Sequence, residues 1–206
     1  MQALYNDYFF GIIVLSLFSL QGIVMIFSKG SIRLEKPNGG IISWFYNILN
    51  LSIIMIITPI VAFSLFGKIN ISVFLISINF NSETFNQNLS FFGLILFAIG
   101  SLIMFWSRIT IWDNFRLGAV EPKGNDKLIQ KGLYKIIRHP TYLSVIINAF
   151  GLSFLSKSAI ILILTICIIY LIIKIIPIEE ILLKGFYKNE FNDYKKSTKK
   201  LIPFIY

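Results

Sequence analysis

The stretch KGLYKIIRHPTYLS, residues 131–144, marks the place where a basic connector gives way to an apolar run. It contains the only histidine of the chain, His139, between Arg138 and Pro140. Proline suits the first turn of a helix, because the N–H that it lacks would have no partner there in any case. A second polar feature, the acidic pair Glu179–Glu180, follows the next apolar run. We therefore expect a helical hairpin over residues 140–176 whose two ends, one cationic and one acidic, lie on the same side.

The composition around this stretch is typical of a membrane protein. Hydrophobic residues make up 56% of the 206 residues, and charged residues make up only 14%. Several apolar runs are long enough to cross a bilayer as helices. The runs cover residues 8–27, 41–66, 91–106, 140–155 and 159–176. We predict an all-α, polytopic membrane protein with about five transmembrane helices.

These runs divide one membrane domain, residues 1–206, into four parts. Three N-terminal spans occupy residues 1–106, a basic cytoplasmic connector residues 107–139, the hairpin residues 140–176, and a cytoplasmic amphipathic tail residues 177–206. The first run has neither the basic start nor the cleavage site of a signal peptide, so we expect a retained helix. Pro59 and Pro177 are expected to kink the second and fifth runs. The single cysteine, Cys167, allows no internal disulfide, and we expect no metal site.

The tail after the hairpin shows helical periodicity over residues 181–200. Leu183, Tyr187, Phe191 and Tyr194 recur at a spacing that places them on one helical face, and lysines crowd the rest. Such a helix can lie in the membrane interface against anionic headgroups. It can equally pack on the cytoplasmic face of the protein itself, and the sequence does not separate the two.

The distribution of charge predicts the orientation. Most of the 19 lysines and arginines fall in the loop after the first run, in the connector and in the tail. If five spans alternate, these three segments share one side, which the positive-inside rule makes cytoplasmic. The same rule accounts for the net charge of +9, so we expect membrane lipids rather than nucleic acid as partners. The content of isoleucine, asparagine and lysine suggests an AT-rich bacterial genome, and hence the bacterial inner membrane.

The ends of the hairpin form a candidate ligand site. Free N–H groups at a helix start favour an anion, and Arg138 adds a permanent cation. Tyr134 and Tyr142 supply aromatic faces, while Glu179–Glu180 supply negative charge. S-adenosylmethionine combines a carboxylate, two cationic groups and a planar adenine, so it fits such a site. The alternatives are an arginine that only snorkels to headgroups and a glutamate pair that is only solvated.

The segment GLYKIIRHPTYLS resembles the G-x-Y-x-x-x-R-H-P-x-Y-x-G signature of the isoprenylcysteine carboxyl methyltransferase-like family, which is related to the phospholipid N-methyltransferases. The family continues with a helical hairpin, an E-E pair, an F-G-x-E-Y-x-x-Y segment and I-P. Here these are Glu179–Glu180, residues 187–194 and residues 202–203, so the resemblance covers about residues 126–203. Ser144, Lys188 and Phe191 depart from the pattern, at positions where the family has glycine, glycine and tyrosine.

The resemblance implies an integral membrane methyltransferase that uses S-adenosylmethionine and acts on a lipid-like or prenylated acceptor, through carboxyl methylation of the isoprenylcysteine type. The implied cofactor-binding residues are Tyr134, Arg138, His139, Tyr142, Glu179 and Glu180. The implied catalytic residues are Arg138, Glu180 and Arg116, with either arginine able to hold an anionic acceptor. An amine acceptor would need a base, for which Glu180 and His139 are the candidates.

Three other functions remain open at this point. The first is a methyltransferase of the same fold that acts on phospholipid amines or small thiols. The second is an NADPH-dependent membrane reductase of the sterol type, because such enzymes share R-H-P-x-Y. The third is a membrane scaffold without enzymatic activity.

Overall fold

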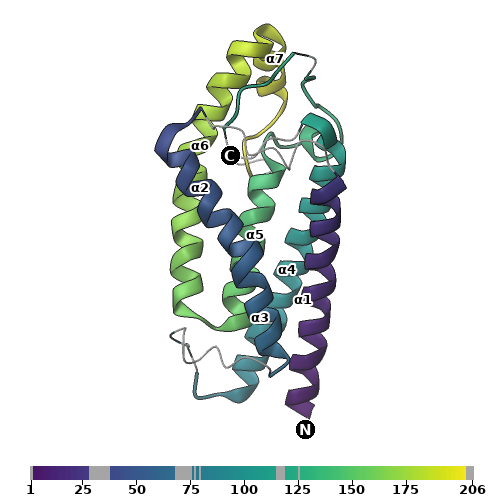
Figure 1. Ribbon diagram of the computed structural model, residues 1–206, viewed down its shortest axis with the longest axis vertical. Helices are drawn as coiled ribbons and strands as arrows, with labels where there is room; N and C mark the ends of the chain where they lie inside the picture. The colour runs from purple at the N-terminus through teal and green to yellow at the C-terminus, as the bar shows by residue number, and fades with distance from the viewer. Residues whose placement is uncertain are drawn as a thin grey trace.

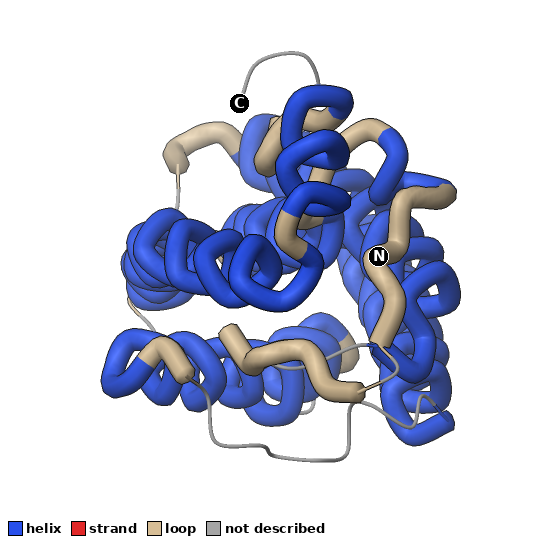
Figure 2. Tube along the Cα trace, turned by 90° about the horizontal axis from the view of Figure 1, so that it is seen from above, coloured by secondary structure: helices blue, strands red, loops and turns tan. Residues whose placement is uncertain are grey.

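The structure is a computed structural model that describes residues 2–27, 38–67, 76, 78, 80–114, 119–124 and 126–202, with only the backbone for residues 2–6 and 113. The described residues form an upright helical bundle without strands (Figures 1 and 2). The elements in chain order are α1 (Gln2–Phe27), α2 (Gly40–Ser52), the π-helix η1 (Ile53–Ile57), α3 (Thr58–Leu65), α4 (Glu83–Ile111), the 3-10 helices η3 (Trp112–Asn114) and η4 (Gly132–Lys135), α5 (Pro140–Ser156), α6 (Ala159–Tyr187) and α7 (Asn189–Ser197).

Four helical segments of the described chain are long and apolar enough to cross a bilayer: Asp7–Phe27, Gly40–Leu65, Glu83–Ile111 and Ala159–Tyr187. Helix α5 is also apolar but has only 17 residues, the lower limit for a span. In Figure 1 the start of α1 and helix α7 lie at opposite ends of the bundle, as an odd number of traverses requires. The chain is thus an integral, all-α membrane protein, whereas the count of five spans stays a prediction.

Two helices extend well beyond their predicted ends. Helix α4 begins at Glu83 instead of residue 91, because Ser82 caps it by accepting a hydrogen bond from the backbone nitrogen of Phe85 at 3.3 Å. Helix α6 continues through Pro177 to Tyr187, so the prediction that it ends before the acidic pair was wrong. The pair therefore lies on the helix itself, and its two side chains point about 100° apart.

The tail is not the single helix predicted for residues 181–200. Lys188 adopts φ 51° and ψ −118°, which ends α6 and starts the separate helix α7. The apolar side of α7 is covered, because Phe191 and Tyr194 are buried and the Tyr194 hydroxyl donates to the carbonyl of Tyr134 at 2.7 Å. Of the two alternatives for this face, the structure shows packing on the protein.

Near Pro59 the second membrane segment changes its winding. The π-helix η1 directly precedes the proline-containing start of α3, and the Thr58 hydroxyl donates to the carbonyl of Ile53 at 2.9 Å. A proline removes one backbone donor and crowds the preceding turn, which a wider helical turn accommodates. The irregularity expected at this proline is therefore a π-helical turn.

Glycines bring α4 and α5 into backbone contact. A Cβ atom on Gly151 would lie 2.6 Å from the backbone nitrogen of Phe97, and one on Gly93 would lie 2.6 Å from that of Leu155. Small residues permit this close approach between membrane helices. Nearer the start of α5, the buried Ser144 hydroxyl donates to the Thr141 carbonyl at 2.6 Å and lies 3.5 Å from Sδ of Met104 on α4. The glycine contacts thus hold the last turns of α5 against the first half of α4, and Ser144 continues the packing toward the start of α5.

Candidate active site

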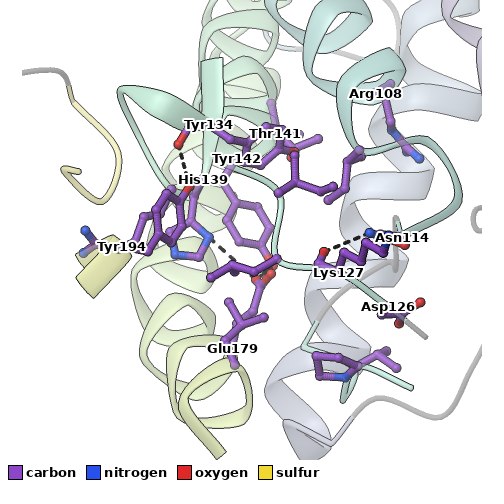
Figure 3. A pocket seen from close by; sticks show the side chains of 18 of the residues that line it. Arg108, Asn114, Asp126, Lys127, Tyr134, His139, Thr141, Tyr142, Glu179 and Tyr194 are labelled. Atoms are coloured by element: carbon purple, nitrogen blue, oxygen red, sulfur yellow. Dashed lines mark hydrogen bonds and ion pairs between the residues drawn. The ribbon is translucent and has the colours of Figure 1, made fainter. Parts of the chain in front are cut away.

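A pocket lies at the end of the bundle where α2 and α5 begin and α4 and α6 end (Figure 3). Part of the connector and Tyr194 of α7 also line it. The space open to the centres of water molecules is about 120 Å³. The polar residues of the lining are Tyr46, Asn50, Arg108, Asn114, Asp126, Lys127, Tyr134, Arg138, His139, Thr141, Tyr142, Glu179, Tyr187 and Tyr194.

Glu179 is the acidic residue of the pair that faces this pocket. Its Oε2 accepts a hydrogen bond of 2.7 Å from the hydroxyl of Tyr142 and lies 3.9 Å from Nδ1 of His139. The His139 ring stacks on Tyr142 with centroids 5.6 Å apart, and Tyr46 of α2 meets Tyr142 edge-on at 5.4 Å. These contacts hold a partly exposed carboxylate in a wall of aromatic rings.

Glu180 points elsewhere and forms a buried ion pair. Its Oε1 lies 2.9 Å from Nε of Arg138, and its Oε2 lies 3.4 Å from Nζ of Lys195. The side chains of Arg138 and Glu180 are only 4% and 8% exposed. We expected both glutamates to line one ligand site, but Glu180 is absent from the lining of this pocket. The two neighbours thus have different surroundings.

Arg138 also binds the chain after α7. Its Nη1 donates to the carbonyl of Thr198 at 2.5 Å and to the hydroxyl of the same residue at 3.3 Å. The backbone adds a short parallel pairing, in which the nitrogens of Arg138 and His139 donate to the carbonyls of Lys199 and Lys200 at 2.8 and 3.0 Å. The R-H-P segment is therefore fastened to α6 and to the tail at once.

Tyr134 is buried beside the pocket, where its hydroxyl lies 3.2 Å from that of Thr141. Burial raises the pKa of Tyr134 to about 12, and burial also raises the pKa of Tyr194. Both phenols are therefore neutral near pH 7. They offer uncharged rings to a planar ligand group.

The structure brings together five of the predicted cofactor-binding residues in the pocket lining: Tyr134, Arg138, His139, Tyr142 and Glu179. The sixth, Glu180, does not line the pocket and contacts this group through its ion pair with Arg138. Arg116 lies outside the described residues. The roles assigned to these side chains stay predictions.

Sequence reasoning missed the opposite wall of the pocket. Tyr46 and Asn50 come from α2, and Arg108 comes from α4; all three are buried. Figure 3 shows Arg108 across the pocket from Glu179. One signal was present: Asn47 and Asn50 interrupt an apolar run, and polar residues inside a membrane segment usually face the protein interior.

Comparison with known proteins shows what the chain resembles. A model of the family "Phospholipid methyltransferase" matches residues 89–190, from within α4 to the start of α7. The probable protein-S-isoprenylcysteine O-methyltransferase of Oryza sativa subsp. japonica is 28% identical over 118 residues, which cover 56% of this chain and 62% of the relative. Over residues 89–190 the chain is thus similar to the phospholipid methyltransferases.

A second relative is protein-S-isoprenylcysteine O-methyltransferase B of Arabidopsis thaliana, 27% identical over 119 residues that cover 57% of this chain and 60% of the relative. The chain thus spans about three-fifths of the length of these curated relatives. The solved structure of the eukaryotic intramembrane Ras methyltransferase ICMT (isoprenylcysteine carboxyl methyltransferase) matches with a TM-score of 0.55 at 19% identity, covering 90% of this chain and 74% of that chain. This likeness shows a shared fold, which includes the helices before residue 89.

Proposed function

We propose that this protein is a membrane methyltransferase that uses S-adenosylmethionine to methylate the carboxylate of a lipid-like or prenylated acceptor. One observation carries the proposal: the pocket has a carboxylate, Glu179, on one side and a buried cation, Arg108, on the other. A cationic methyl donor and an anionic methyl acceptor are complementary to these two sides. The relatives named above support the reaction class.

The cofactor side consists of Glu179, His139, Tyr142 and Tyr134. Glu179 attracts the positive groups of the cofactor, while the neutral rings of the two tyrosines suit its adenine and its sulfonium. Bound S-adenosylmethionine supplies a methyl group that its positive sulfur already activates, so transfer to a carboxylate oxygen needs no proton transfer. The residues have to orient the two reactants and exclude water.

Arg138 and Glu180 act as positioning residues in this proposal. Their ion pair is buried behind the pocket, and Arg138 holds the segment after α7 through Thr198. We expected Arg138 to bind a carboxylate directly. In its place we assign Arg138 a role in closing the pocket. Arg108 takes the position of the acceptor-binding arginine.

The acceptor reaches the pocket from the bilayer. A small cavity between α1, η1 and α4 shares Ile54, Met104 and Arg108 with the pocket and is otherwise lined mostly by apolar residues such as Met25 and Met55. The lipophilic part of the acceptor would lie on this side. The N-terminus would lie outside, and the pocket would open at the cytoplasmic face of a bacterial inner membrane.

A phospholipid amine is the second candidate acceptor, because the matching family is described as phospholipid methyltransferases. A carboxylate acceptor is favoured because the side of the pocket opposite Glu179 carries an arginine, which would repel a cationic amine.

The test is methyl transfer by the purified protein in lipid nanodiscs with S-adenosylmethionine labelled in the methyl group. The acceptors are N-acetyl-S-farnesylcysteine and phosphatidylethanolamine. A methyl ester releases its label as volatile methanol in base, whereas an N-methyl group does not. We expect base-labile label on the farnesylcysteine. Label found only in a base-stable lipid would establish the amine reaction instead, and absence of cofactor binding by calorimetry would refute both.

A further inference from the structure

We infer that a groove between α6 and α7 binds the phosphate headgroup of an anionic phospholipid. Among the residues that the structure describes, this groove shares no lining residue with the pocket proposed for methyl transfer. The bound lipid is therefore not the methyl acceptor. Such a lipid would be held whatever reaction takes place in the pocket.

The groove lies between the last turns of α6 and helix α7, at the end of the bundle shown uppermost in Figure 1. The space open to the centres of water molecules is about 350 Å³, which is larger than in the pocket and can admit a phosphate group. The polar residues of its lining are Glu180, Lys184, Asn192, Lys195 and Lys200. The groove is thus the place where the acidic residue that is absent from the pocket meets three lysines.

The lining of the groove has a net positive charge. Its one carboxylate, Glu180, is already held by Arg138 at 2.9 Å and by Lys195 at 3.4 Å. Lys184 is exposed, and the side chain of Lys195 is 53% exposed. Lysine ammonium groups bind phosphate as point charges, and the side-chain amide of Asn192 can donate a further hydrogen bond. The groove is therefore complementary to a phosphate and not to a cation.

An exposed apolar face of α6 leads into the groove. Ile163, Ile166, Tyr170, Ile173 and Ile181 are 50–70% exposed. At 3.6 residues per turn they fall within a sector of about 80° around the helix, and the last of them lines the groove. Acyl chains can pack along this face while their headgroup occupies the groove. This continuity favours a lipid over a soluble phosphate.

The depth of the groove agrees with the headgroup layer of a bilayer. Helix α6 begins at Ala159, and about 20 helical residues cross the hydrocarbon core, which therefore ends near Ile178. Ile181 and Lys184 then lie roughly 4–9 Å beyond the core, at 1.5 Å per residue. Lys174 lies about 6 Å inside that boundary, from which its long side chain can reach the headgroups.

The test is native mass spectrometry of the purified protein in an uncharged detergent, with phosphatidylglycerol and phosphatidylcholine of identical acyl chains. A difference between the two lipids then reports the charge of the headgroup. We expect phosphatidylglycerol to bind roughly 25- to 125-fold tighter, because two or three lysines each contribute about a factor of five beside an anionic headgroup. Glycerophosphoglycerol, the same headgroup without acyl chains, should not displace the lipid at equal concentration.

Variants assign the binding to the groove. Lys184→Gln and Lys200→Gln should each lower the affinity for phosphatidylglycerol about fivefold and leave that for phosphatidylcholine unchanged. Lys196→Gln is the matched control, because Lys196 carries the same charge on α7, does not line the groove and pairs with Asp193 at 2.8 Å. It should change the affinity less than about twofold. Lys184 and Lys196 are both exposed, so neither substitution disturbs the core.

Three results would overturn the inference. Equal affinity of the wild-type protein for the two lipids would exclude a phosphate site, and this comparison needs no variant. Equal losses in all three variants would assign the effect to the general charge of the tail. Displacement by glycerophosphoglycerol at equal concentration would identify a soluble phosphate ester as the ligand. None of these measurements depends on methyl transfer, so failure of the proposed function would be a separate result.

Discussion

Replacing Arg138 by lysine should release the segment after α7 without unfolding the bundle. Arginine uses two separate nitrogens, Nε to Glu180 at 2.9 Å and Nη1 to the Thr198 carbonyl at 2.5 Å. The single ammonium of lysine can satisfy only one of these sites. A hydrogen bond to a charged group contributes about 1.5–3 kcal/mol, so the ratio of docked to released tail should fall roughly 10- to 150-fold. Insertion should be normal, because the charge is retained.

Hydrogen exchange followed by mass spectrometry measures this directly. The amide of Lys199 donates to the Ile136 carbonyl at 3.2 Å and should exchange faster by that factor, while the amides of α4 and α5 should not change. Lys196→Ala is the control, since its exposed pair with Asp193 should contribute little. Unchanged exchange at Lys199 combined with weaker binding of S-adenosylmethionine would refute the role in tail docking. It would indicate that Arg138 contacts the cofactor directly.

Four further outcomes follow from the same geometry. Glu179→Gln should keep the fold and weaken S-adenosylmethionine binding roughly 10- to 150-fold by calorimetry, because the acid that accepts a hydrogen bond from the Tyr142 hydroxyl loses its charge. Arg108→Met should raise KM for a carboxylate acceptor without changing cofactor affinity in the same calorimetric titration. Gly151→Ala should lower stability by about 1–3 kcal/mol in thermal denaturation, whereas Gly185→Ala, where a Cβ meets open space, should not. Lys188→Gly should raise stability by about 1 kcal/mol, because Lys188 has a φ of 51°.

The spans and the hairpin were predictable because their signal is a run of apolar residues, which needs no knowledge of tertiary contacts. Helix α5 begins at Pro140 as expected, since its first turn tolerates the missing donor. The departure at Lys188 was visible in the sequence as a missing family glycine. Its physical meaning emerged only with the positive φ at that residue, a conformation that glycine adopts without strain.

The different surroundings of Glu179 and Glu180 were not predictable. Adjacent positions in a helix point in different directions, so the direction that faces the pocket depends on the phase of α6, and the sequence suggested that α6 ends at Pro177. The place of Arg108 in the pocket was equally unpredictable, because an arginine at the end of an apolar run usually snorkels to the headgroups. Its surroundings come from distant parts of the chain, because Arg108 lines the pocket together with Tyr46 of α2 and a second cavity together with Gly22 of α1.

The walls of the pocket are held in place in different ways. Backbone contact through Gly93 and Gly151 fixes α4 against α5, and with it the relation between the end of α4 and the R-H-P segment. Helix α2 forms another wall of the pocket with Tyr46 and Asn50, outside the α4–α5 glycine contacts. A substitution at Asn50 should therefore leave in place the hydrogen bonds that hold Glu179 to Tyr142 and Arg138 to Glu180. Under the proposed function, the acceptor side of the pocket thus depends on α2 and α4, and the cofactor side depends on α5 and α6.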